Sequence, residues 1–183
     1  MVFKNFDLKH QPTKPQIIIE VSFFLPARNQ IPICCDGSSR GNPGAVGYGF
    51  VCRDEMGGCI YAEATGLGIE TNYIAELVAI TGASEWDIQN NKLDICTNSD
   101  SKAAVSAYMS GRLPWFMQVR WKRIKELLNN IQLVHSLREV NFSADSMAKK
   151  GAGLVRGGKL IFNSKPSFIP DLESPEKIYY RFC

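Results

Sequence analysis

Four acidic residues lie where a regular element of the chain begins or ends, and carboxylates gathered in this way can hold divalent cations. Asp36 and Asp100 each close an apolar run, Glu76 lies one turn into a helical pattern, and Asp145 lies in the first turn of another. Clustered carboxylates repel one another unless cations neutralise them, and oxygen-only ligands favour Mg²⁺ or Mn²⁺ over zinc. If the four acids meet, two Mg²⁺ ions, with Mn²⁺ as a substitute, would balance their charges. Such a site suits phosphodiester hydrolysis, with one ion activating a water and the other stabilising the leaving oxygen.

Each acid also has an ordinary structural interpretation. Asp36 alone suits a turn, and Glu76 alone suits an exposed helix position. Asp100 and Asp145 could cap or stabilise the N-termini of their helices. We favour a shared site because four such coincidences occur in one chain.

The elements that must position these acids form a mixed pattern. Three strands joined by turns come first, followed by a helix, a strand, two helices, a strand and a last helix. This order predicts an α/β fold with a mixed five-stranded sheet and helices on both faces, in which Asp36 and Asp100 end neighbouring strands at one crevice. A glycine-rich loop is expected to follow Asp36. The predicted strands are residues 31–36, 47–53, 59–65, 93–97 and 131–137, and the predicted helices are residues 71–88, 101–109, 115–129 and 142–150.

Length and composition suit one globular domain with extensions. The chain has 183 residues, of which 45% are hydrophobic and 21% charged. We divide it into an N-terminal leader (1–30), the domain (31–153) and a C-terminal extension (154–183). Residues 17–24 of the leader could dock as an extended piece, and the aromatic run at 179–182 could pack on the domain. We expect a monomer.

The cysteines indicate a reducing compartment. Six are present without a C-x-x-C pair, and five lie in strand-like apolar runs, which is typical of buried free thiols rather than a zinc site. The polar N-terminus lacks the apolar stretch of a signal peptide, and no run is long enough to cross a membrane. We therefore expect an intracellular protein, nuclear or cytoplasmic, that does not associate with membranes. A net charge of +3 is compatible with a nucleic-acid partner but does not argue for one.

Four short motifs in chain order resemble type I ribonuclease H, and more narrowly the RNase H-like domains of plant non-LTR retroelement reverse transcriptases. The resemblance extends from about Lys14 to Cys183. The motifs are Asp36-Gly37-Ser38 with Gly41-Asn42-Pro43-Gly44, Thr71-Asn72 with Ala75-Glu76-Leu77, Ser99-Asp100-Ser101, and Arg138-Glu139-x-Asn141 with Ala144-Asp145-Ser146.

This resemblance implies a mixed five-stranded sheet and a two-Mg²⁺ endonuclease that cleaves the RNA strand of RNA–DNA hybrids, leaving 5′-phosphates. It implies that Asp36, Glu76, Asp100 and Asp145 are catalytic metal ligands, with Asp36 bridging both ions. His135, ten residues before Asp145, matches a histidine that assists proton transfer or product departure; a lone surface histidine is the alternative.

The same resemblance implies substrate contacts around the glycine-rich loop and the start of the first helix. Two asparagines would sense 2′-hydroxyls at the minor groove, although one could serve only its turn and the other only its helix cap. The candidate substrate-binding residues are Gly37, Ser38, Ser39, Asn42 and Asn72.

Three functions stay open from the sequence. The first is a hybrid endonuclease, part of or derived from a reverse transcriptase polyprotein, and the complete set of acids favours it. The second is a domesticated, catalytically weak or inactive module that binds hybrid or other nucleic acid; the lack of a reverse transcriptase and a thin basic surface motivate it. The third is another nuclease of the same superfold, such as an integrase or junction resolvase, and the spacing of Glu76 and the Thr71-Asn72 turn argue against it.

Overall fold

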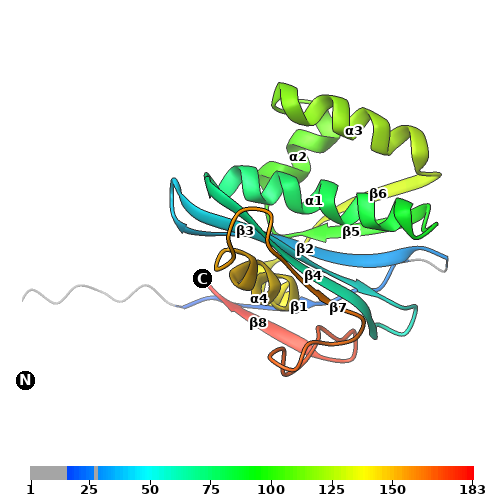
Figure 1. Cartoon of the computed structure of the whole chain (residues 1–183). Helices are drawn as coiled ribbons and strands as arrows, with labels where there is room; N and C mark the ends of the chain where they lie inside the picture. Colours follow the sequence, from blue (N-terminus) through cyan, green and yellow to red (C-terminus); the bar gives the residue numbers. More distant parts are fainter. Residues whose placement is uncertain (1–15, 27–28) are drawn as a thin grey trace, which may run out of the picture.

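A computed structural model of the chain describes residues 16–26 and 29–183. Its main sheet contains β2 (Ile31–Gly41), β3 (Gly44–Arg53), β4 (Cys59–Glu70), β5 (Asp94–Ser99), β6 (Asn130–His135) and β7 (Lys159–Phe162). The strand order is β6-β5-β2-β3-β4-β7 (Figure 1). β2, β5 and β6 run parallel, and β3, β4 and β7 join through antiparallel pairs. The sheet is therefore mixed, as predicted.

Helices cover both faces of this sheet. The helices are α1 (Asn72–Gln89), α2 (Lys102–Ser110), α3 (Trp115–Leu127) and α4 (Phe142–Gly151), and a short 3₁₀ turn, η2 (Arg138–Val140), precedes α4. α1, α2 and α3 lie on one side and α4 lies on the other (Figure 1). The strands alternate accordingly: Ile33 and Cys35 pack in the core under α1, whereas Cys34 packs in the core beside α4. The predicted element order and the two helical layers are confirmed.

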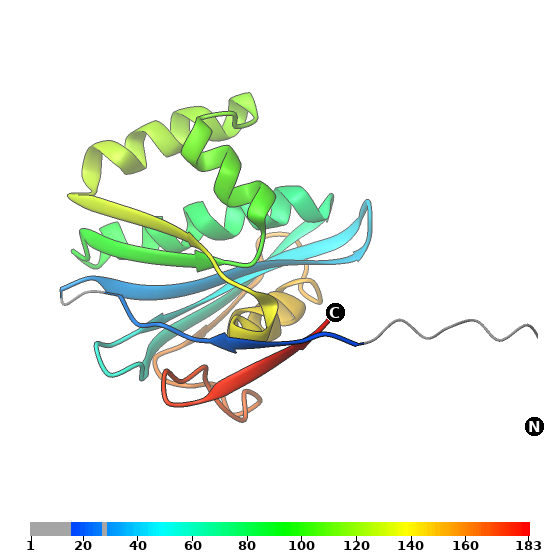
Figure 2. The same cartoon turned by 180° about the vertical axis from the view of Figure 1, so that it is seen from behind.

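Two parts of the sheet arrangement were not predicted. β7 adds a sixth strand beside β4, from a region in which the sequence shows no periodicity. β1 (Ile18–Ser22) and β8 (Ile178–Phe182) form a separate antiparallel pair on the α4 side (Figure 2). Ile17 and Cys183 exchange two backbone hydrogen bonds, of 3.2 and 2.9 Å, beyond that pair. The leader and the tail thus hold each other.

The glycine-rich loop expected after Asp36 is mostly strand. β2 continues to Gly41, and β3 begins at Gly44, so only Asn42 and Pro43 separate the two strands. The glycines instead allow helices to approach the sheet. A Cβ on Gly37 would lie 2.4 Å from the backbone nitrogen of Glu76 in α1, and a Cβ on Gly49 would lie 2.4 Å from the Cβ of Met147 in α4.

The buried face of α3 also differs from the expected one. The amphipathic pattern of this segment predicts that Phe116, Ile124, Leu127 and Leu128 point inward. Phe116 and Leu127 are instead each 45% exposed. The helix instead buries Met117, Trp121 and Ile124, a stripe with helical spacing that packs against the α1 side of the core.

All six cysteines are free. Four are buried, and burial raises the pKa of Cys34 to about 12, so that it stays a protonated, apolar core thiol. Within residues 16–26 and 29–183, none of the helices combines the length and the apolar character needed to cross a lipid bilayer.

The core contains one acid without a hydrogen-bond partner in the described residues. Asp87 of α1 is fully buried, and neither of its carboxylate oxygens is bonded. Burial raises the pKa of this carboxyl from its ordinary value to about 8, and the positive charge of Lys92 offsets only part of that rise. Asp87 therefore carries a proton at neutral pH.

We expect this proton to make stability depend on pH. Between the unfolded pKa and a folded pKa of about 8, the folded state binds the extra proton, so its stability falls as pH rises across that window. The slope should be on the order of 1 kcal/mol per pH unit. Urea unfolding of the wild type and of Asp87→Asn between about pH 5 and pH 9 measures the difference. Parallel curves would show that Asp87 does not titrate in the folded state.

Candidate active site

The parallel strands bring three predicted site residues to one edge of the sheet. Cys35 of β2 lies opposite Ser99 of β5, and Ser99 lies opposite His135 of β6. Asp36 and Asp100 directly follow the first two of these positions. β5 and β6 end here, as predicted, and place Asp100 and His135 beside Asp36. Asp36 itself does not end its strand, because β2 continues to Gly41.

Glu76 reaches this edge from the start of α1. Thr71 caps the helix, since its hydroxyl accepts a 3.3 Å hydrogen bond from the Ile74 amide. One turn later, the Glu76 carboxylate accepts a 3.1 Å hydrogen bond from the backbone amide of Gly37, the residue after Asp36. The bare Cα of Gly37 is what allows α1 to come this close.

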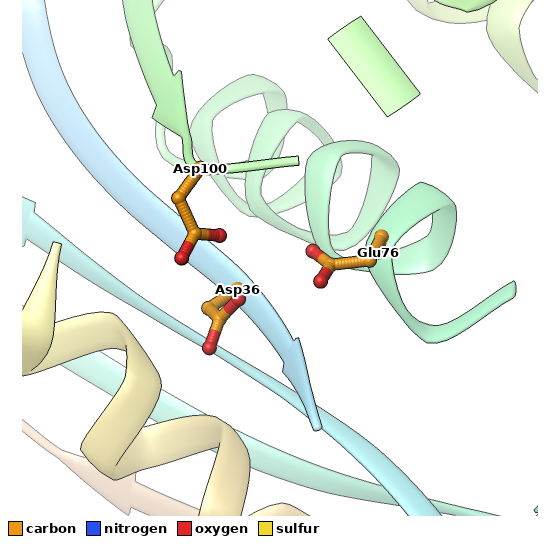
Figure 3. Close-up of side chains that lie close together, drawn as sticks. All are labelled: Asp36, Glu76 and Asp100. Atoms are coloured by element: carbon orange, nitrogen blue, oxygen red, sulfur yellow. The ribbon is translucent and has the colours of Figure 1, made fainter. Parts of the chain in front are cut away.

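Asp36, Glu76 and Asp100 point toward one another (Figure 3). Each offers a carboxylate oxygen, and these three oxygens all lie within 4.8 Å of one another. Asp36 and Glu76 are buried, and Asp100 is half-buried. This confirms that three of the predicted ligands from three separate elements converge.

Burial and neighbouring negative charge strongly disturb the ionisation of Asp36 and Glu76. Burial, followed by the charges of Glu76 and Asp100, raises the pKa of Asp36 to about 10. Burial and Asp100 also raise the pKa of Glu76 to about 8, against the opposing hydrogen bonds from Gly37 and Asn72. A site that suppresses its own ionisation in this way is suited to a cation, which would restore the charged forms. Because all the donors are oxygens, they fit Mg²⁺ or Mn²⁺ better than zinc.

Asp145, the fourth predicted ligand, lies near this group but outside it. Its carboxylate accepts hydrogen bonds from Arg138 at 3.0 Å and from Lys149 at 2.5 Å. It is close enough for its charge to contribute to the raised pKa of Asp36. Among the described residues, the carboxylates that lie within 4.8 Å of one another are only the other three.

The two predicted substrate asparagines are linked to the acidic group. The side-chain oxygen of Asn42 accepts a 3.3 Å hydrogen bond from the backbone amide of Asn72. The side-chain amide of Asn72 donates a 3.4 Å hydrogen bond to the Glu76 carboxylate. Asn42 is exposed at the β2–β3 turn. A chain of polar groups therefore leads from the surface to Glu76.

The remaining predicted site residues lie at the end of β2 and at the end of β6. Ser38 and Ser39 are half-buried near the end of β2, and the Ser39 hydroxyl donates to the Gly41 carbonyl. His135 is exposed at the end of β6 and lines a cavity together with Asp100.

Sequence reasoning missed the cations that hold Asp145. Lys149 follows Asp145 by four residues on a helix, a spacing that alone predicts an ion pair. Arg138 belongs to the Arg138-Glu139-x-Asn141 motif, but the sequence alone does not show that this arginine pairs with Asp145. Asn141 of the same motif is buried and donates a 3.0 Å hydrogen bond to the Cys35 carbonyl, which fixes the start of α4 beside β2.

Comparison with known proteins places this geometry in a family. The family model described as RNase H matches residues 28–152. A curated Ribonuclease HI from Streptomyces coelicolor is 34% identical over 95 residues. That alignment spans 52% of this chain and only 40% of the curated relative.

Solved structures agree with the family match. The RNase H1 of the halophilic archaeon Halobacterium salinarum NRC-1 superimposes with a TM-score of 0.61 at 26% identity, covering 68% of this chain and 98% of that one. LC11-RNase H1, isolated from compost and solved with an RNA/DNA hybrid, gives a TM-score of 0.59 at 29% identity, with coverages of 68% of this chain and 97% of that one. A foamy viral protease-reverse transcriptase shares the fold at 20% identity and a TM-score of 0.58, over 81% of this chain and 22% of that one.

Proposed function

The chain belongs to the RNase H family, and from this we propose that it hydrolyses the RNA strand of RNA–DNA hybrids with divalent metal ions. The observation that carries the proposal is the convergence of Asp36, Glu76 and Asp100, whose carboxylate oxygens lie within 4.8 Å of one another beside the carboxyl end of β5. The hybrid bound in the LC11-RNase H1 structure, a protein that this chain matches over two thirds of its length, supports the same substrate class.

The chain's own residues divide the work as follows. Asp36, Glu76 and Asp100 would hold two Mg²⁺ ions, for which Mn²⁺ can substitute, and Asp145 would complete the set by exchanging its contacts with Arg138 and Lys149 for a metal contact. When bound, such ions supply an activated water and neutralise the leaving oxygen. His135 would assist proton transfer or product departure from the exposed end of β6.

Substrate binding would use the polar residues around the acidic group. Asn42 and Asn72 would contact the minor groove, where 2′-hydroxyls distinguish RNA from DNA. Gly37, Ser38 and Ser39 would lie against the backbone of the strand that is cut. Asn72 would also orient Glu76 through the hydrogen bond already described.

A labelled RNA–DNA hybrid tests this proposal. The wild type should cut only the RNA strand in the presence of Mg²⁺, leave 5′-phosphates, and lose activity in EDTA. Duplex DNA, duplex RNA and a four-way junction serve as competing substrates. Cleavage of the junction alone would indicate another nuclease of the superfold, and no cleavage of the hybrid would overturn the proposal.

One observation favours a second candidate, a module that binds hybrid or other nucleic acid with little or no turnover. The ion pairs of Asp145 with Arg138 and Lys149 compete with its use as a metal ligand. Binding of the hybrid without metal-dependent cleavage would identify this function.

Further proposals rest on the sequence motifs and composition. We propose that the chain is closest to plant non-LTR retroelement domains and that it is part of, or derives from, a reverse transcriptase polyprotein. Within the chain, we propose that residues 31–153 form the catalytic unit and that the leader and the tail are extensions of it. We also propose a monomer that does not associate with membranes and lies in the nucleus or cytoplasm. Phylogenetic placement, light scattering and imaging of a tagged chain would test these points.

A further inference from the structure

A cavity with cations in its wall lies directly beside the acidic group. It has a volume of about 590 Å³, and its wall includes Asp100 and His135 from the edge of the sheet. The same wall carries three permanent cations from three separate elements: Lys102 of α2, Arg138 of η2 and Arg181 of β8. Three cations and one carboxylate therefore line the cavity, and two of the cations also have an acidic neighbour outside the lining.

Arg181 is the unexpected member of this set. It lies in the tail, outside residues 28–152 that match the family model, and reaches the cavity because β8 pairs with β1. Its Cα lies opposite that of Ile19, which also lines the cavity. The docking of leader against tail is thus what brings this cation to the site.

The cations differ in how firmly they are already paired. Arg138 contacts Asp145 at 3.0 Å. Arg181 lies 3.9 Å from the Glu139 carboxylate, at the outer limit of an ion pair, and its side chain is 42% exposed. Lys102, two residues after Asp100, is exposed and forms no ion pair with any residue the structure describes. Lys102 and Arg181 therefore have capacity for an outside anion.

We propose that Arg181 and Lys102 bind a backbone phosphate of the RNA–DNA hybrid next to the metal centre, so that the tail forms part of the substrate-binding surface. The inference rests on the proposed function, because that function supplies the phosphate. Guanidinium and ammonium groups beside a cleft are suited to phosphate oxygens, and each such contact adds to the salt dependence of binding.

Binding of a hybrid to the uncleaving Asp36→Asn protein, measured by fluorescence anisotropy at several KCl concentrations, tests this inference. Arg181→Met and Lys102→Ala should each weaken binding about tenfold. Each should also reduce the slope of log Kd against log salt by about one. Arg181→Met keeps an apolar stem on β8, and a thermal melt confirms that the tail stays docked. Arg181→Lys should retain most of the affinity.

Lys177→Ala is the matched control, because Lys177 is an exposed tail cation that pairs with Asp171 and does not line the cavity. In the wild-type background, Arg181→Met should raise KM and leave kcat nearly unchanged. If Arg181→Met and Lys102→Ala bind hybrid as Lys177→Ala does, the inference is wrong even when cleavage is intact. If the wild type binds hybrid without cleaving it, the hydrolase proposal fails while the affinity comparison still decides the role of Arg181.

Discussion

An Asp36→Asn variant is expected to lose its metal-dependent cleavage of RNA–DNA hybrid by at least about 10²-fold. Loss of a group that only orients a metal ligand costs about 10–100-fold, and a direct ligand should cost no less. Asparagine keeps the shape of the side chain but removes one of the three carboxylates whose oxygens lie within 4.8 Å of one another and could bind a metal ion. The initial rate on a labelled hybrid measures this effect.

The same variant should change how stability responds to Mg²⁺. Asp36 is held protonated by burial and by its two acidic neighbours, so its replacement should leave the metal-free protein equally stable or more stable. The rise in thermal midpoint on adding Mg²⁺ should shrink. Asp94→Asn, at the opposite end of β5, is the matched control and should behave as the wild type. Cleavage by Asp36→Asn within tenfold of the wild type would contradict the assignment of Asp36.

A Glu173→Ala variant is expected to lower the free energy of unfolding by about 3–5 kcal/mol, the usual cost of leaving one partner of a buried ion pair alone. Arg53 and Glu173 form an ion pair in which both side chains are fully buried. The Glu173 carboxylate also accepts hydrogen bonds from the amide and the hydroxyl of Ser143, at 2.7 and 2.8 Å. Arg53 lies over the ring of Phe23, with its guanidinium carbon 4.8 Å from the ring centre.

Urea unfolding of Glu173→Ala, compared with Lys177→Ala, measures this cost. The Lys177–Asp171 pair is exposed and screened by solvent, so Lys177→Ala should unfold at nearly the same urea concentration as the wild type. An Arg53→Met/Glu173→Leu double variant should recover much of the loss, since it removes the unpaired buried charge. A loss below about 1 kcal/mol in Glu173→Ala would show that the tail carries little of the stability.

The sequence was sufficient to predict the positions of three site acids, because the local helix and strand patterns agree with the arrangement of the elements in the sheet. Thr71 or Asn72 was expected to cap α1, and Thr71 does so. The alternation of strands and helices predicted that β2 and β5 are neighbours that bring Asp36 and Asp100 together, which is confirmed, although β2 continues past Asp36 to Gly41. Convergence of Glu76 with these two followed from the same layout. In each case a cap, a turn or an apolar run determined where the carboxylate would lie.

The sequence was insufficient where a partner lies far along the chain. β8 becomes a strand because β1 offers it an edge, and neither segment shows a strand pattern strong enough to stand alone. The glycines after Asp36 suggested a loop, whereas they serve the close approach of α1 and α4. Asp145 was expected among the other acids, but its side chain pairs with Arg138 and Lys149. The four-residue spacing predicts that Lys149 can reach Asp145, but it does not show that this pair forms in place of a contact with the other acids.

The paired backbone hydrogen bonds between Ile17 and Cys183 have a topological consequence. They hold Ile17 and Cys183, near the two ends of the described backbone, side by side. A short linker could therefore join these two residues, and new termini could be made elsewhere in the chain. The exposed turn from Asp54 to Gly58, between β3 and β4, is a suitable place for the new termini. Such a circular permutant would begin in the middle of the sheet and keep every strand pair, because the order of elements along the chain is separable from their arrangement in space.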